Sequence, residues 1–298
     1  MVDLTKNAPP QPDNQRLRTP EAFKSACSLF RRVSGRIALV LTETYALKDT
    51  CLGERGYGIA HLLNALGGTC GGILKVGDHP AFVEQSFMLG RAALEQAINV
   101  AYVALGDESV HEDLVKHAMQ RKYRQMSQSA GKGDQQVRLE HTGRPEDLSD
   151  HPELREAVEQ FTSNRERPKN WPGKSVEQRI EAIAEHLSER KITILLLAKM
   201  SIYGRASEAL HGSLAGATMI DAQDFQFDEE RGDFTWGEHG VWLTTLYITL
   251  SRVLEVLLWV LAETTEAEAV AEQYEKASDE IDKFFEELNS TSDGSQET

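Results

Sequence analysis

The sequence predicts an all-α protein, a helical bundle of about seven to nine helices with a small β-hairpin inserted near residues 223–237. Two observations predict the helices: apolar residues recur every three or four positions, and capping residues precede several of these stretches. A third observation predicts the hairpin, because apolar and polar residues alternate around a turn in the stretch DFQFDEERGDFTW.

The first half of the chain opens with a tail, residues 1–18, which is rich in Pro, Asn and Gln and is expected to be disordered. Thr19 and Pro20 then form a helix start, a capping hydroxyl followed by proline. The glycine-rich stretch GGTCGG lacks the lysine of a phosphate-binding loop and is expected to be a turn. Helices are expected at residues 19–47, 59–66, 78–105 and, after a capping box at Ser109 and Glu112, 109–127.

The second half begins with a polar, glycine-containing stretch, residues 129–150, which is expected to be a mobile loop. Further helices are expected at residues 152–163, 175–203, 203–218 and 241–262. Together these elements predict a single helical domain over residues 19–263. An acidic amphipathic helix at 264–288 and a disordered tail at 289–298 are expected to follow it.

Composition disfavours several classes of function. The chain has 47 acidic and 32 basic residues and a net charge of −15, which disfavours a broad nucleic-acid-binding surface. The three cysteines show no spacing for a metal site or disulfide framework, so we expect reduced thiols, a cytoplasmic protein and neither metal nor other cofactor. The apolar run at 241–261 contains Arg252 and Glu255, which can pair on one helix face. A buried core helix, with no membrane partner, is therefore expected there.

Three helices each carry one polar line on an otherwise apolar surface. Arg91, Glu95 and Asn99 are four residues apart, and so are Tyr203, Ser207 and His211. A third line consists of Tyr247, Ser251 and Glu255. Buried charges are costly unless they are paired, so these lines are expected to face one another. The predicted network joins Arg91 and Glu95 to Tyr203, Ser207 and His211, with an extension to Glu255.

The stretches RAALEQAINVAYVALGD, RPKNWPGKS and YGRASEALHGS together resemble a family of uncharacterised bacterial helical proteins. The resemblance covers roughly residues 60–261 and rests on an Arg-x3-Glu helix, a tryptophan loop and a Tyr-x3-Ser-x3-His helix. It implies a site at the corresponding positions, which are Arg91, Glu95, Trp171, Tyr203, Ser207 and His211. For the predicted polar site as a whole, the candidate catalytic residues are His211, Arg91 and Glu95, and the candidate ligand-binding residues are Tyr203, Ser207, Trp171 and Asn99.

A second resemblance is to HEPN-type ribonucleases, whose signature is an arginine, then four to six residues, then a histidine. Arg205 and His211 have this spacing. The resemblance implies metal-independent RNA cleavage at the cleft of a homodimer, with histidine transferring a proton and arginine stabilising phosphate charge. On a straight helix, however, Arg205 lies roughly 120° from the line of His211.

Two functions therefore stay open. One is a helical protein whose internal polar cluster binds a ligand or serves a regulatory or structural role. The alternative is a HEPN-like ribonuclease of a toxin or phage-defence system, with RNA as its substrate. A third interpretation is that the polar network has a purely structural role and holds the helices in register.

Overall fold

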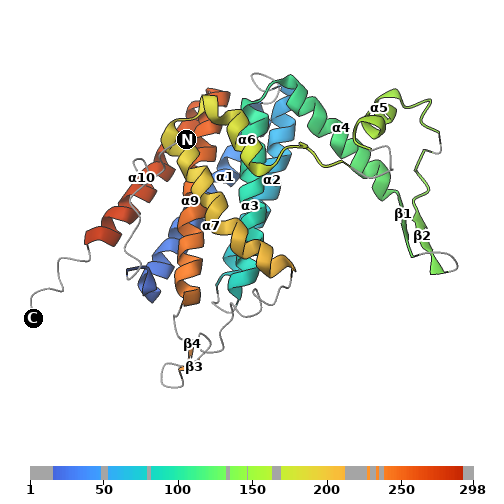
Figure 1. Ribbon diagram of the computed structural model, residues 1–298. Helices are drawn as coiled ribbons and strands as arrows, with labels where there is room; N and C mark the ends of the chain where they lie inside the picture. The colour runs from blue at the N-terminus through green and yellow to red at the C-terminus, as the bar shows by residue number, and fades with distance from the viewer. Residues whose placement is uncertain are drawn as a thin grey trace, which may run out of the picture. The chain divides into compact units, whose positions relative to one another are not determined.

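A computed structural model describes residues 16–47, 53–78, 82–131, 135–145, 147–162, 169–211, 227–228, 233–234 and 238–290 (Figure 1). These residues form nine α-helices and two small antiparallel two-stranded sheets, which confirms the predicted all-α class with a β-hairpin. The chain divides into two compact units, one made of Met1–Leu105 with Val176–Thr298 and the other of Gly106–Ser175. The range predicted as a single domain, residues 19–263, thus includes residues of both units.

The described part of the first unit contains most of the helices. They are α1 (Pro20–Leu47), α2 (Gly53–Val76), α3 (Val83–Leu105), α6 (Val176–Ile183), α7 (Glu189–His211), α9 (Glu238–Thr265) and α10 (Glu268–Ser290), with short 3-10 turns η1 (Arg16–Arg18) and η5 (Ala184–His186). Strands β3 (Phe227–Asp228) and β4 (Asp233–Phe234) pair with Phe227 opposite Phe234, as expected for the hairpin near 223–237.

Helix α9 forms the centre of this unit, where it packs against α1, α3, α7 and α10. Tyr247 of α9 is fully buried, and its ring lies 5.8 Å from that of Phe23 and 5.4 Å from that of Phe30, both on α1. Helix α1 begins as predicted, since the backbone N–H of Ala22 donates to Thr19 Oγ1 at 3.1 Å. Each large apolar side chain buried here contributes about 1.5–3 kcal/mol of transfer free energy.

Helix α2 does not end at GGTCGG, so the predicted turn is wrong. The helix continues because Leu63, Leu66, Cys70 and Ile73 keep a buried stripe running past the glycines. Burial of these side chains outweighs the helix-propensity cost of about 1 kcal/mol for each glycine.

The predicted junction between the helices 175–203 and 203–218 lies elsewhere in the structure, and residues 212–218 are outside the described residues. Helix α6 ends at Ile183, and η5 ends at His186, followed by Leu187, whose backbone is extended. Helix α7 then begins after Ser188, whose carbonyl oxygen accepts from the N–H of Ile192 at 3.1 Å. It runs without a break through Tyr203, so the polar line at 203–211 lies on a single helix.

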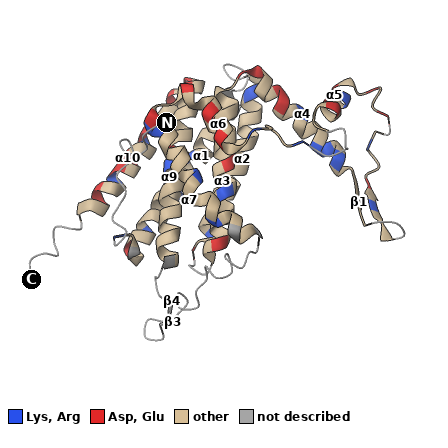
Figure 2. Cartoon of the chain, viewed as in Figure 1, with Lys and Arg blue, Asp and Glu red and all other residues tan. Residues whose placement is uncertain are grey.

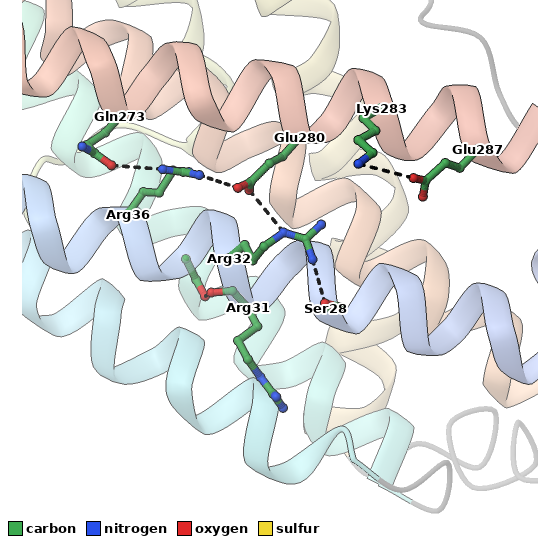
Figure 3. Close-up of polar contacts among 9 residues, drawn as sticks. Ser28, Arg31, Arg32, Arg36, Gln273, Glu280, Lys283 and Glu287 are labelled. Atoms are coloured by element: carbon green, nitrogen blue, oxygen red, sulfur yellow. Dashed lines mark hydrogen bonds and ion pairs between the residues drawn. The ribbon is translucent and has the colours of Figure 1, made fainter.

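Helix α10 is amphipathic, as predicted, and acidic residues recur along it (Figure 2). Figure 3 shows how it is held to α1: the Arg36 guanidinium donates to Glu280 and, at 3.1 Å, to Gln273 Oε1. Arg32 lies 3.5 Å from the second oxygen of Glu280. This group of ion pairs, which we call the α1–α10 clamp, reappears below as a control.

Some residues of both predicted tails belong to helices in the structure. Residues 16–18 form η1, and Arg16 Nη1 donates to Oδ1 of Asn289 at 3.1 Å. Helix α10 continues to Ser290. Residues 1–15 and 291–298 lie outside the described residues.

Among the residues that the structure describes, two helices have the length and apolar composition of a membrane span: α2, and residues His239–Thr265 of α9. Within the protein, 78% of the apolar window of α9 is buried, which is the pattern of a core helix. The pair predicted between Arg252 and Glu255 is present, with Nη1 and Oε2 2.9 Å apart. Because both residues face α10, their charges are compensated inside the protein.

The second unit consists of α4 (Glu108–Gln125), β1 (Ser127–Ala130), β2 (Val137–Glu140) and α5 (Pro152–Gln160). Helix α4 is capped by Asp107, whose carboxylate accepts from the N–H of Val110, and not by Ser109 as predicted. The loop predicted at 129–150 is also corrected, since β1 and β2 pair as a hairpin. The sequence of β1, SQSA, has no alternation of apolar and polar residues that would predict a strand. Its pairing with β2, ten residues later, accounts for its extended backbone.

Candidate functional site

Six polar residues from three helices of the first unit, Tyr203 among them, contact one another. Their spacing of four along α3 and α7 gives each helix a polar line, and α3 packs against both α6 and α7 (Figure 1). We call this group the Arg91 cluster; it consists of Arg91, Glu95 and Asn99 from α3, Arg179 from α6, and Tyr203 and Ser207 from α7.

Arg91 joins α3 to α7. Its Nε donates to Glu95 Oε1 at 3.1 Å and its Nη1 donates to Ser207 Oγ at 3.0 Å. The guanidinium carbon lies 4.4 Å from the centre of the Tyr203 ring, within the range of a cation–π contact. The predicted meeting of Arg91 and Glu95 with Tyr203 and Ser207 is therefore present in the structure.

Glu95 accepts from both sides of the cluster. The Tyr203 hydroxyl donates to its Oε1 at 2.5 Å, and Arg179 Nη2 lies 4.0 Å from its Oε2. Arg179 Nη1 also donates to Asn99 Oδ1. One carboxylate thus stands between two guanidinium groups.

Arg179 is the member that the sequence prediction missed. It is 5% exposed and lies on the buried face of α6 together with Val176, Ile180 and Ile183. An arginine at a core position of a short amphipathic helix is a signal that could have identified it, because such a charge needs a buried partner.

Burial and neighbouring charges set the protonation of the cluster. Desolvation and the bond to the Glu95 carboxylate raise the pKa of Tyr203 well above its usual range, so the phenol is a hydrogen-bond donor at neutral pH. Desolvation lowers the pKa of Arg91, but Glu95 and Tyr203 raise it by more, and the net shift is upward. The Arg91 and Glu95 side chains are 29% and 34% exposed, so solvent reaches the cluster.

The remaining predicted site residues lie elsewhere or are not described. The extension to Glu255 is wrong, because its carboxylate accepts from Ser278 of α10 and pairs with Arg252. Trp171 belongs to the second unit, where it precedes a cis peptide bond to Pro172. The backbone of His211 ends α7, but its side chain lies outside the described part of the chain, so its predicted role stays a prediction.

Arg205 does not belong to the Arg91 cluster. Its guanidinium carbon lies 3.6 Å from the centre of the Trp242 ring and 5.7 Å from that of Phe87. This placement agrees with the angle of roughly 120° between Arg205 and the polar line of α7. Arg205 also lines a cavity of about 460 Å³ between α7 and α9, together with Trp242, Met200 and Thr249.

No group of three or more His, Cys, Asp or Glu side chains that could hold a metal ion occurs among the residues that the structure describes. The cluster is instead a set of hydrogen-bond donors, two of them cationic, around a single carboxylate. Such a set can recognise an anionic group, because guanidinium donors match the geometry of carboxylates and phosphates.

The fold and the cluster together define an all-helical protein with a partly exposed Arg–Glu–Tyr network. The chain belongs to a family of unknown function, DUF5677, whose model matches residues 73–228. This confirms the resemblance to an uncharacterised family; the Arg-x3-Glu and Tyr-x3-Ser-x3-His motifs as its signatures, and the HEPN-like assignment, stay predictions. No curated protein and no solved structure shows significant similarity to the chain.

Proposed function

We propose that this protein is a cytoplasmic binding protein whose Arg91 cluster recognises the anionic group of a small ligand without converting it. The observation that carries the proposal is the convergence of two guanidinium groups on one carboxylate at a partly exposed site. Arg91 and Arg179 both contact Glu95, and the hydroxyl groups of Tyr203 and Ser207 lie beside them. Guanidinium donors match the geometry of carboxylates and phosphates, so a group of this kind favours an anionic ligand.

The hydroxyl groups support binding over proton transfer. Tyr203 has a raised pKa, so it stays protonated and serves as a donor. Ser207 accepts from Arg91 and can donate its own proton to a ligand. Arg91 and Glu95 are partly exposed, so a ligand that replaces solvent on these two side chains does not have to open the core.

Anion binding can be measured by thermal unfolding with inorganic phosphate or acetate, at constant ionic strength set by chloride. The expected result is a rise in Tm that grows with the logarithm of anion concentration, as linkage requires. Arg91→Gln should abolish this rise. Arg36→Gln is the matched control: it also removes a partly buried, ion-paired arginine, but from the α1–α10 clamp, and it should keep the rise.

Two results would overturn the proposal. One is equal unfolding curves for the native chain in phosphate, acetate and chloride. The other is a phosphate effect that Arg91→Gln leaves unchanged. If Arg91→Gln does not fold, Ser207→Ala provides the same comparison with a smaller structural change, because it removes only one accepted hydrogen bond.

The ribonuclease alternative has its own readout. Incubation of the protein with total RNA, without metal, would show degradation that His211→Ala and Arg205→Ala each abolish. That result would replace the binding proposal with the HEPN-like assignment. Intact RNA together with an anion-dependent Tm would favour binding.

A further inference from the structure

We propose that strand β2 is the surface through which two copies of this chain associate. The two β2 strands pair antiparallel across a two-fold axis, with Leu139 opposite Leu139 of the second copy. The two hairpins then form one four-stranded sheet. This inference does not depend on the Arg91 cluster, which lies in the other unit.

The backbone of β2 shows which of its groups are available. In the β1–β2 pair, Gln128 is opposite Leu139 and Ser129 is opposite Arg138. The N–H of His141 donates to the carbonyl oxygen of Met126 at 2.8 Å, so this position is a hydrogen-bonded pair. Hydrogen-bonded pairs alternate along an antiparallel ladder. Leu139 therefore bonds to β1, while the N–H and C=O groups of Arg138 and Glu140 point to the outer edge.

The side chains of β2 are also uncovered by the described residues. All four residues of the strand are exposed, including Val137 at 63% and Leu139 at 67%. These two side chains point to the same face of the hairpin, since they are two positions apart. An isolated two-stranded hairpin is only marginally stable in water, and an open edge is a template for a further strand.

The charges of Arg138 and Glu140 indicate that the partner of β2 is a second copy of the same strand, and they also determine the register of the pairing. Only three registers pair outward-facing residues with each other. Centring the pair on Arg138 places two arginines directly opposite, and centring it on Glu140 places two glutamates opposite. Centring it on Leu139 places Arg138 opposite Glu140 of the second copy, twice. Opposite charges across strands are favourable and like charges are unfavourable, so β2 is self-complementary in this register alone.

The same two residues already pair within one chain, where Arg138 Nη2 lies 2.8 Å from Glu140 Oε1. Both side chains are more than half exposed, at 64% and 53%, so they are able to turn toward a second strand. In the Leu139-centred register, Leu139 and its counterpart form a non-hydrogen-bonded pair. Side chains approach most closely in such pairs, so the two leucines cover each other.

Charge reversal tests the register, with association measured by sedimentation equilibrium. Arg138→Glu alone and Glu140→Arg alone should each weaken self-association at least about tenfold, because two attractive pairs become repulsive. The double variant Arg138→Glu/Glu140→Arg should restore it. An equimolar mixture of the two single variants should form a heterodimer, because every new charge then faces its opposite. Arg155→Glu on α5, an exposed reversal of the same size in the same unit, should change nothing.

Cross-linking gives an independent readout. Leu139→Cys should form a disulfide-linked dimer under mild oxidation, since opposed residues in a non-hydrogen-bonded pair lie close enough for this bond. Gln128→Cys, on the outer strand β1 of the four-stranded sheet, should not. A native chain that is monomeric up to about 100 μM would overturn the proposal. Self-association that survives both single reversals, or cross-links equally through either cysteine, would overturn it as well.

Discussion

The hydroxyl of Tyr203 donates a 2.5 Å hydrogen bond to Oε1 of Glu95, a residue 108 positions earlier in the chain. This bond connects the middle of α7 to the middle of α3 and orients the carboxylate that both arginines contact. The stability of the helix interface therefore depends on it.

Tyr203→Phe should lower the free energy of unfolding by about 1–2 kcal/mol, because it removes one hydrogen bond to a charged acceptor and keeps the ring under Arg91. Urea unfolding followed by circular dichroism measures this change. Tyr57→Phe is the control, since Tyr57 is 49% exposed and its loss of a hydroxyl should cost almost nothing. Equal effects of the two substitutions would contradict the role given to the Tyr203 bond.

Arg179→Ala should be the more damaging substitution, with a loss on the order of 2–4 kcal/mol. It deprives Asn99 and Glu95 of a buried partner and leaves a void in the packed face of α6. Chemical unfolding gives the magnitude. The comparison is Arg32→Ala, which removes an ion-paired arginine whose side chain is 48% exposed and should cost less than about 1 kcal/mol. A loss for Arg179→Ala as small as that for Arg32→Ala would argue against a structural ion pair on α6.

Alkaline pH should destabilise the protein through Tyr203. The pKa of Tyr203 is higher in the folded state than in the unfolded state. As pH rises through about 10, the unfolded chain therefore loses the phenol proton while the folded chain keeps it. Stability is then unaffected by this group below pH 10 and falls above it, by at most about 1.4 kcal/mol per pH unit. Unfolding measured between pH 8 and pH 11 should show a shallower alkaline decline for Tyr203→Phe than for the native chain. Parallel curves would mean that this phenol is not protected by folding.

Two glycines in helices should respond to alanine in opposite directions. Gly68 is exposed on α2 and a Cβ there would meet no atom within 4 Å, so Gly68→Ala should stabilise the protein by about 0.5–1 kcal/mol. At Gly90 on α3 a Cβ would come within 2.7 Å of Leu246 Cδ1, a side chain that is 1% exposed. Gly90→Ala should therefore destabilise by about 1–3 kcal/mol, because the buried Leu246 side chain must leave its packed position or α3 and α9 must move apart. Thermal unfolding of both variants checks the sign; stabilisation by Gly90→Ala would mean that Leu246 can move freely.

The helices and their polar lines were predictable because they depend on local geometry. A spacing of four places Arg91 beside Glu95 and Tyr203 beside Ser207 on any α-helix. The cost of burying charge then favoured the meeting of α3 and α7, which the structure contains. The continuation of α2 through its glycines was not predictable from local signals, since burial against other helices decided it.

The sequence by itself determined the helical class, the polar lines on α3 and α7, and the internal pairing of Arg252 with Glu255. Only the tertiary structure decided which lines meet. Glu255 faces α10 instead of α3, and Arg179 reaches Asn99 from 80 positions away. The pairing of β1 with β2 is of the same kind. The reason is physical: positions within a helix follow from its period, whereas contacts between distant segments follow from how all the apolar faces are buried at once.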